Sequence, residues 1–280
     1  MPTEPALPRH GAAGTAVTRT VTSADGTRIA FDRLGAGTPI ILAAGAFNTR
    51  SATDPLARVL SEQCLVINYD RRGRGDSGDT SPYAVDREIE DLAALIDEVG
   101  GSAAVFGYSS GATLALKAAA GGLSISHLAL YEPPFRTAAD DPGLPQDFPR
   151  QLSELIAAGR RGDAVELYQT TAVRIPPPVV AQMRESPFRP QLEAIAHTLV
   201  YDATIVGDLS LPTELIGSVA TPALVLCGTG ASPFMRAAAA AVAVALPAGR
   251  LAEPESQGHG IDARATAPVV AEFLGAAPQP

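Results

Sequence analysis

The segment Gly107-Tyr108-Ser109-Ser110-Gly111 decides how the chain folds. It follows an apolar run at 103–106, typical of a buried strand, and precedes a run typical of a helix that begins at Ala112. Gly-x-Ser-x-Gly between a strand and a helix predicts a nucleophile elbow, because its glycines allow a tight turn that exposes the serine hydroxyl. Without these flanks the five residues would carry little weight in a chain with 26 glycines.

Short apolar runs along the rest of the chain predict a parallel sheet. They span residues 39–42, 65–69, 103–106, 128–131, 223–227 and 250–252. Most are separated by segments with helical periodicity, and continuous apolar strands that alternate with helices are typical of a parallel sheet covered on both faces. Nearer the N-terminus, runs at 17–21 and 28–32 flank an Ala-Asp-Gly-Thr turn. That pattern predicts an antiparallel hairpin.

A helix is predicted over about 85–99, where apolar residues recur along one stripe. The stripe consists of Val85, Ile89, Leu92, Ile96 and Val99. This spacing has the period of a helix that packs one face against a core. The pair Ser81-Pro82 predicts the cap and first turn of this helix, and the pair Gly100-Gly101 predicts its end.

The alternation of strands and helices stops between residues 135 and 218, where all patterns are helical. Asp163 followed by Glu166 predicts a capping box at the start of one of these helices. We therefore expect a helical cap at 135–218, inserted after the sixth strand of a core formed by 15–134 and 219–280. Residues 1–14 are rich in Pro, Gly and Ala and are expected to form a flexible tail.

The charge of the chain excludes several classes of partner. Its 280 residues carry a formal net charge of -9, whereas nucleic acids and anionic membranes bind basic surfaces. The hydrophobic fraction of 46% is typical of a globular protein with a full core. No run is apolar enough for a signal peptide or long enough to span a membrane. We expect a cytoplasmic protein with a small-molecule partner, and the choice between monomer and homodimer stays open.

The cysteines give no sign of a cofactor. Cys64 and Cys227 lie in or beside apolar runs, which predicts buried strand thiols rather than a disulfide or a metal site. No cluster of His, Cys and Asp has the spacing of metal ligands. The pair Gly73-x-Gly75 lacks the lysine and helix of a phosphate loop. We therefore expect neither a metal nor another cofactor.

A serine nucleophile requires a base, and His259 is the best placed of the four histidines. It lies in Ser-Gln-Gly-His-Gly, a loop between the last predicted strand and the C-terminal helix. His10 falls in the expected tail, His127 opens a strand and His197 lies in the cap. For these three, a packed or surface role is favoured.

From about residue 17 to 274 the chain resembles the α/β-hydrolase fold. Three segments carry the resemblance: the elbow, the loop around His259 and the segment 69–77 (Tyr-Asp-Arg-Arg-Gly-Arg-Gly-Asp-Ser). The loop resembles the family's histidine loop, and the segment 69–77 resembles the family's turn after strand four. The resemblance implies a mostly parallel eight-stranded sheet flanked by helices. The arginines of this turn are interleaved with Asp70 and Asp76, which predicts local pairing; binding of a substrate carboxylate is the alternative.

Two positions depart from the family pattern. The first is the family's His-Gly after strand three, which is replaced by Ala44-Gly45. Because backbone N–H groups stabilise an oxyanion, this loss need not empty the oxyanion hole. We assign its donors to Ser110 and Ala46, with Phe47 as the near alternative to Ala46.

The second departure concerns the triad acid, since no Asp or Glu occurs from residue 228 through 251, where the family commonly has it. Glu132 directly follows the sixth strand, and some α/β-hydrolase-fold enzymes, among them a group of haloalkane dehalogenases, place their acid there. The alternative is that Glu132 caps the start of the cap or pairs with an arginine. Asp202 and Asp208 are weaker candidates. Asp262 follows the histidine too closely to orient it.

These residues predict a cofactor-independent serine hydrolase with a triad of Ser109, His259 and Glu132. Its expected substrate is an ester, lactone or thioester of a small, largely apolar molecule. One alternative is a lyase, cyclase or acyltransferase of small-molecule metabolism on the same fold. Another is a ligand-binding protein with weakened catalytic machinery, an alternative motivated by the missing acid after strand seven and the altered oxyanion loop.

Overall fold

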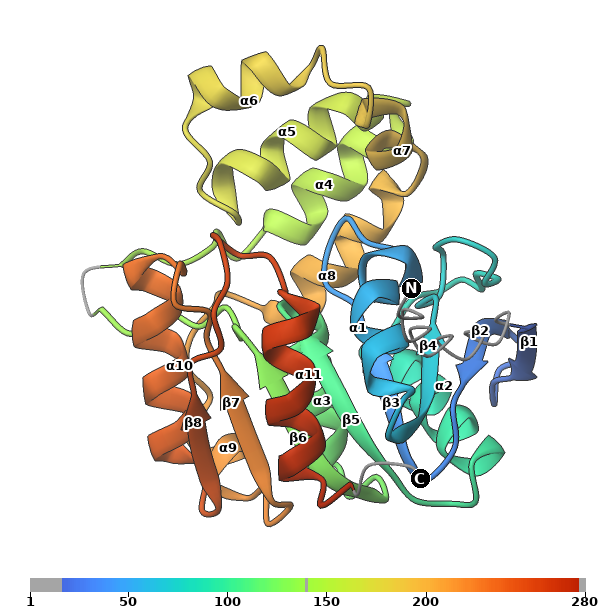
Figure 1. Ribbon diagram of the computed structural model, residues 1–280. Coiled ribbons are helices and arrows are strands. Elements are labelled where there is room, and N and C mark those ends of the chain that lie inside the picture. The colour runs from blue at the N-terminus through green and yellow to red at the C-terminus, as the bar shows by residue number, and fades with distance from the viewer. Residues whose placement is uncertain (1–16, 139–140, 277–280) are drawn as a thin grey trace, which may run out of the picture.

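The computed structural model describes residues 17–138 and 141–276, which form an eight-stranded sheet with helices on both faces (Figure 1). The strands are β1 Val17–Thr22, β2 Arg28–Leu34, β3 Thr38–Ala43, β4 Cys64–Tyr69, β5 Ala103–Tyr108, β6 Ile125–Tyr131, β7 Ala223–Leu226 and β8 Gly249–Ala252. The expected tail at 1–14 lies outside the described residues.

The order of the strands in the sheet is β1-β2-β4-β3-β5-β6-β7-β8. β1 pairs antiparallel with β2, and β2 pairs antiparallel with β4, whereas the other neighbours are parallel. The predicted opening hairpin and the predicted α/β-hydrolase fold are both confirmed. Because β5 is central and has β3 and β6 as neighbours, the chain that leaves its carboxyl end is surrounded by other strand ends.

Two layers of helices bury the sheet. One face is covered by α2 Val85–Glu98, α3 Ser110–Ala120, α9 Thr213–Gly217 and α10 Pro233–Ala245, and the other by α1 Asp54–Leu60 and α11 Ala263–Phe273. Alternation along β3 shows why both faces are apolar: Ile41 packs in the first layer, and Ile40 and Leu42 pack in the second. The apolar layers on both faces of the sheet therefore fix the positions of the strands and of their ends.

After β6 the chain forms a group of helices that lie above the sheet in Figure 1. They are α4 Phe148–Ala157, α5 Arg161–Thr171, α6 Pro177–Met183, α7 Arg189–Ala194 and α8 Leu199–Val206. We call them the cap helices. Of these, α8 also packs against α3 of the core, whereas α9 packs against α3 and α10 on the face of the sheet. No helix among the described residues is long and apolar enough to cross a membrane.

Two predicted helix starts are wrong. The helix α2 begins at Val85 rather than at Ser81-Pro82, because Ala84 is extended. Tyr83 has tertiary contacts instead: its ring stacks on Tyr201 with centroids 3.9 Å apart, and its hydroxyl donates to Glu88. The predicted end of this helix is right, since Gly100 and Gly101 follow it with φ of 104° and 85°.

The predicted capping box in the cap is the second wrong start. The helix α5 begins at Arg161, so Asp163 lies inside its first turn rather than before it. Asp163 pairs with Arg160, and Glu166 pairs with Arg184. Ion pairs with neighbouring arginines thus use the two side chains that a capping box would require.

Candidate active site

Ser109 lies at the turn between β5 and α3, in a backbone conformation that a serine rarely adopts. Its φ is 56° and its ψ is -120°, and its N–H donates to the carbonyl of Tyr131 at 2.9 Å. A Cβ at Gly107 would lie 2.5 Å from the Cα of Ala112, and one at Gly111 would lie 2.3 Å from the carbonyl oxygen of Ala43. Only glycine therefore fits at positions 107 and 111. The strained backbone of Ser109 between them is typical of functional turns.

Glu132 directly follows β6, where the chain turns away from the sheet with φ of 47°. Its N–H donates to the carbonyl of Leu226 at 2.8 Å, and its carboxylate is fully buried. One oxygen, Oε1, accepts from the N–H of Gly228 at 2.9 Å. The other, Oε2, is hydrogen-bonded to Nδ1 of His259. The structure thus brings together the predicted acid and the predicted base.

The loop that carries His259 is held by two tyrosine hydroxyls. Tyr108 donates to the carbonyl of His259 at 2.8 Å, and Tyr131 donates to the carbonyl of Gly260 at 2.9 Å. Burial raises the pKa of Tyr131 to about 12, so its hydroxyl stays protonated and can donate. The imidazole also packs beside the ring of Tyr108, with centroids 5.0 Å apart. These contacts fix the ring between Glu132 and the cavity described next.

A cavity of about 130 Å³ lies between the elbow and the cap. Its polar lining consists of Asn48, Tyr108, Ser109, Ser110 and His259. The remaining lining residues are Ala46, Phe47, Pro134, Tyr168, Ala172, Val173, Val206, Leu209 and Met235. None of these described lining residues is an Asp, Glu, Lys or Arg. The arrangement is that of a mainly apolar pocket with a few convergent polar groups.

The structure places all three predicted oxyanion residues on this cavity. Ser110 opens helix α3, so its N–H belongs to the unpaired first turn of a helix. Ala46 and Phe47 lie on the loop after β3, and Phe47 has φ of 65°. The side-chain amide of Asn48 donates to the carbonyl of Ala46 at 2.8 Å. The loop and the helix start thus face the same space as the serine.

The other candidate acids have partners away from His259. Asp202 is buried against Arg71 and Arg74. Asp208 pairs with Arg136 at 3.2 Å, and Asp262 caps α11 by accepting from two backbone N–H groups. Of the candidates weighed, Glu132 is the carboxylate in contact with the imidazole.

His127, His197 and the two cysteines lie outside the cavity lining. His127 packs edge-on against Phe273, and His197 lies 3.5 Å from Asp79, whereas His10 is outside the described residues. Cys64 and Cys227 are buried free thiols, and burial raises the pKa of Cys227 to about 11. Among the described residues, no three or more His, Cys, Asp or Glu side chains are grouped so as to hold a metal.

The predicted local pairing in the turn after β4 is wrong. Arg71, Arg72 and Arg74 are almost fully buried, and none of them pairs with Asp70 or Asp76. Arg71 instead donates twice to Glu88, at 2.6 and 2.7 Å, and Arg72 donates twice to Asp91 of the same helix. Long guanidinium side chains reach acids of other elements, which a local pattern does not show. Because these carboxylates hold the arginines in the interior, none of the three arginines is free to bind a substrate carboxylate.

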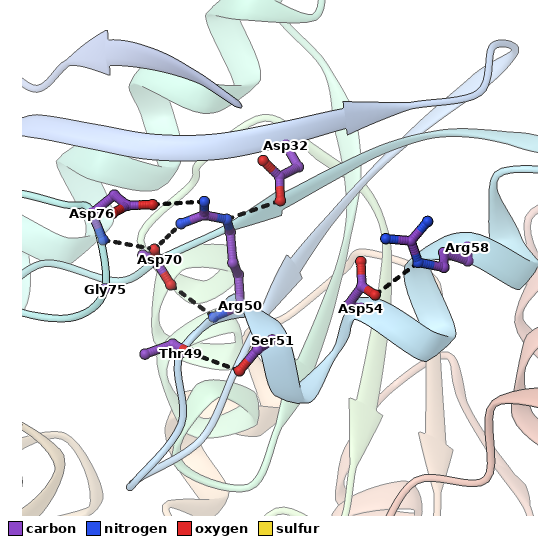
Figure 2. Close-up of a pocket in the computed structure, with 9 residues that line it drawn as sticks. All are labelled: Asp32, Thr49, Arg50, Ser51, Asp54, Arg58, Asp70, Gly75 and Asp76. Atoms are coloured by element: carbon purple, nitrogen blue, oxygen red, sulfur yellow. Dashed lines mark hydrogen bonds and ion pairs between the residues drawn. The ribbon is translucent and has the colours of Figure 1, made fainter. Parts of the chain in front are cut away.

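The two aspartates of the turn pair with Arg50 instead. Figure 2 shows Arg50 surrounded by Asp32, Asp70 and Asp76 in a second cavity of about 390 Å³. Its backbone N–H also donates to Asp70 at 2.7 Å. Burial alone would lower the pKa of Arg50, but its hydrogen bonds to these carboxylates outweigh burial and raise it. Arg50 thus links three carboxylates of different segments but offsets only part of their charge, so the cluster keeps a net negative charge.

Sequence reasoning missed most of the pocket wall. Tyr168, Ala172 and Val206 come from the cap helices or their ends, and Met235 comes from α10. The apolar stripes of these helices gave no signal, because residues that face a cavity and residues that face a core look alike in one sequence. Tyr108, in contrast, is the second residue of the elbow itself, and its hydrogen bond across 151 residues could not be read locally.

Comparison with known proteins places the chain in a family. The chain is similar to an alpha/beta hydrolase from Sphaerobacter thermophilus, with 50% identity, a TM-score of 0.86, and coverage of 91% of this chain and 100% of that one. A thermophilic esterase from Thermogutta terrifontis is 22% identical with a TM-score of 0.70, covering 94% and 98% of the two chains. An enol-lactonase from Burkholderia xenovorans is 23% identical with a TM-score of 0.68, covering 92% and 100%.

The two more distant structures show the fold alone, and no curated protein matches by sequence. A model of the alpha/beta hydrolase family matches residues 10–272. That span covers the sheet, the elbow, the cap helices and the loop of His259. The chain therefore belongs to the alpha/beta hydrolase family.

Proposed function

We propose that the protein is a serine hydrolase in which Ser109 is the nucleophile, His259 the base and Glu132 the acid that orients the base. The hydrogen bond between Nδ1 of His259 and the buried carboxylate of Glu132, with Ser109 on the same cavity, carries this proposal. A carboxylate on Nδ1 keeps the proton there, which leaves Nε2 free to accept a proton from the serine.

The reaction follows from these roles. Nε2 of His259 takes the hydroxyl proton as Oγ of Ser109 attacks the substrate carbonyl. The N–H groups of Ser110 and of Ala46 or Phe47 stabilise the oxyanion that forms. His259 then protonates the leaving group, and water releases the acyl group from Ser109 by the same steps.

The pocket lining supports a small, neutral, largely apolar substrate. Its wall is mainly apolar, with no acidic or basic side chain among the described lining residues, and its volume is only about 130 Å³. A substrate carboxylate would lose its hydration there without gaining a cationic partner. We infer an ester, lactone or thioester with a short acyl chain. The esterase and enol-lactonase among the structurally similar proteins are in keeping with this class.

The geometry argues against a ligand-binding protein with weakened machinery. That alternative rested on the missing acid after β7 and on the altered oxyanion loop. The carboxylate of Glu132 occupies the position on Nδ1 that such an acid would take, and Ala46, Phe47 and Ser110 still line the cavity beside Ser109. Burial of a carboxylate lowers the stability of the fold unless the charge is paired and hydrogen-bonded, as the charge of Glu132 is by Gly228 and His259.

A panel of p-nitrophenyl esters of increasing chain length tests the proposal. We expect turnover that is fastest for acetate and butyrate and falls for octanoate and longer chains. A fluorophosphonate probe should label the wild type with unit stoichiometry and leave Ser109→Ala unlabelled. Covalent labelling without ester turnover would favour a lyase, cyclase or acyltransferase, and persistent labelling of Ser109→Ala would refute the nucleophile.

A further inference from the structure

Asp202 is a fully buried carboxylate of helix α8 that reaches from the cap into the core. Its two oxygens accept from Arg71 at 2.9 Å and from Arg74 at 2.8 Å. Oδ1 also accepts from the hydroxyl of Ser110 at 2.7 Å. A single cap residue thus contacts the turn after β4 and the residue directly after the nucleophile.

The charge on this carboxylate is held by its partners. Burial alone would raise the pKa of Asp202, but the charges of Arg74 and Arg71 outweigh burial and lower it. The ionised form is therefore the stable one. Because an unpaired charge in the interior is strongly unfavourable, the two guanidinium groups and the carboxylate fix one another's positions.

The same two arginines hold the loop after β3. Arg74 donates to the carbonyl of Gly45 at 2.7 Å and to that of Asn48 at 3.3 Å. Arg71 donates to the carbonyl of Ala44 at 3.2 Å. These three carbonyls flank Ala46 and Phe47 on both sides. The arginines therefore set the path of the backbone that carries one proposed oxyanion donor.

This loop has little freedom at its closest approach to the nucleophile. A Cβ at Gly45 would lie 2.9 Å from the Cβ of Ser109 and 2.9 Å from the carbonyl oxygen of Tyr108. Donors of an oxyanion hole act only when they are held close to the productive geometry. Since alanine stands where the family commonly has a histidine after strand three, the loop depends on other side chains for this precision.

We propose that Asp202 is a positioning residue for the oxyanion hole. Through Arg71 and Arg74 it holds the N–H of Ala46 or Phe47, and through the hydroxyl of Ser110 it holds the other donor. Docking of α8 on the core then becomes a condition for stabilising the tetrahedral intermediate. This inference rests on the proposed serine-hydrolase function.

The test compares the wild type with Asp202→Asn in the full chain. The readouts are kcat and KM for p-nitrophenyl butyrate, and Ki for a trifluoromethyl ketone with the same acyl chain. That ketone becomes a tetrahedral oxyanion on Ser109, so its affinity reports the oxyanion hole. We expect kcat to fall by about 10²-fold, the scale of one lost oxyanion donor, with KM changed by less than about threefold. Ki should weaken in proportion to kcat/KM.

Asp208→Asn is the matched control, since it removes a carboxylate just beyond the end of α8 that pairs with Arg136 instead. We expect this variant to keep the wild-type kcat and Ki. If Asp202→Asn folds with the wild-type kcat and Ki, the inference is wrong. A loss of kcat with an unchanged Ki would also overturn it. The oxyanion hole would then be intact, and the loss of kcat would come from a structural defect elsewhere.

Two further variants decide the matter if Asp202→Asn does not fold. Ser110→Ala removes one contact of the carboxylate and keeps both arginine pairs. Arg74→Lys keeps the charge beside Asp202 but replaces the planar guanidinium, which donates to Asp202, Gly45 and Asn48 at once. Each should weaken Ki and kcat/KM together, and an unchanged Ki in both would refute the inference. A wild type without turnover or Ser109-dependent labelling would instead refute the proposed function itself.

Discussion

Replacing Glu132 by glutamine should inactivate the enzyme while leaving it folded. The two residues have the same shape, and both oxygens of the glutamate have defined partners: Gly228 N–H for Oε1 and His259 Nδ1 for Oε2. In Glu132→Gln, the amide oxygen must stay on the Gly228 N–H, because an NH₂ group there would face another donor. The amide NH₂ is then directed at Nδ1 of His259.

This orientation imposes the wrong tautomer on the imidazole. Facing a donor, Nδ1 must act as an acceptor, so the ring proton moves to Nε2 and His259 can no longer take the proton of Ser109. A tautomer error of this kind in a serine triad lowers kcat by about 10⁴-fold. That factor corresponds to about 5.5 kcal/mol of transition-state stabilisation. Because the retained hydrogen bond and shape keep the site packed, we expect Tm to change by only a few degrees.

The assay is steady-state hydrolysis of p-nitrophenyl butyrate, with circular dichroism and Tm to verify folding. Glu255→Gln is the matched control: it removes an exposed carboxylate from the loop of His259 and should keep the wild-type rate. A folded Glu132→Gln variant within tenfold of the wild-type kcat would refute the role of Glu132. A loss of the same size in Glu255→Gln would show that the charge of the whole loop matters, which the geometry does not predict.

Three further changes test other parts of the structure. Ala172→Leu should narrow the cavity and lower kcat/KM for p-nitrophenyl butyrate relative to acetate by about tenfold, since excluding a methylene or two is worth about 1–3 kcal/mol; equal losses for both esters would contradict the pocket assignment. Gly75→Ala should lower the free energy of unfolding by about 2 kcal/mol or more, because Gly75 has φ of 53° and a Cβ there would lie 2.1 Å from Oδ2 of Asp70; urea unfolding measures this, and an unchanged midpoint would argue against that clash. The hydrogen bonds from Arg174, followed by the N–H of Gly143, lower the pKa of Asp141 to about 2. The stability from this ionised carboxylate should therefore be complete at pH 7 and be lost as the pH falls from about 4 towards 2, so the difference in Tm between wild type and Asp141→Asn should shrink over that range; a constant difference would be the contrary result.

Local patterns predicted the parts of the fold that depend on local chemistry. The strand-to-helix turn at Ser109 was predictable because glycine is required at fixed positions around it. Every apolar run proposed as a strand coincides with one, and the errors at their ends are small, as at β6, which begins at Ile125 rather than Leu128. Glu132 could be singled out because no acid occurs from residue 228 through 251 and because the resemblance to the α/β-hydrolase fold implies an alternative position for the acid at the end of strand six.

What the sequence could not predict were the contacts between distant segments. Arg71 and Asp202 are 131 residues apart, and the sequence offered Asp70 and Asp76 as nearer partners. Tyr83 disrupted the expected start of α2 through its contacts with Tyr201 and Glu88. In both cases burial selects the partner, and burial depends on the packing of the whole chain. The cap helices were the least predictable part for the same reason.

The position of Glu132 has a consequence for how this scaffold can be altered. Because the proposed acid comes from the end of β6, the loop after β7 contributes the backbone N–H of Gly228 to the carboxylate and no acid of its own. That loop leads into α10, which places Met235 on the cavity wall. Met235 can therefore be exchanged in a library without removing a charged group from the proposed triad, whereas Gly230 must be kept, because a Cβ there would lie 2.5 Å from the carbonyl oxygen of Ser256. In this chain, the end of the segment that commonly carries the acid is available for reshaping substrate selectivity.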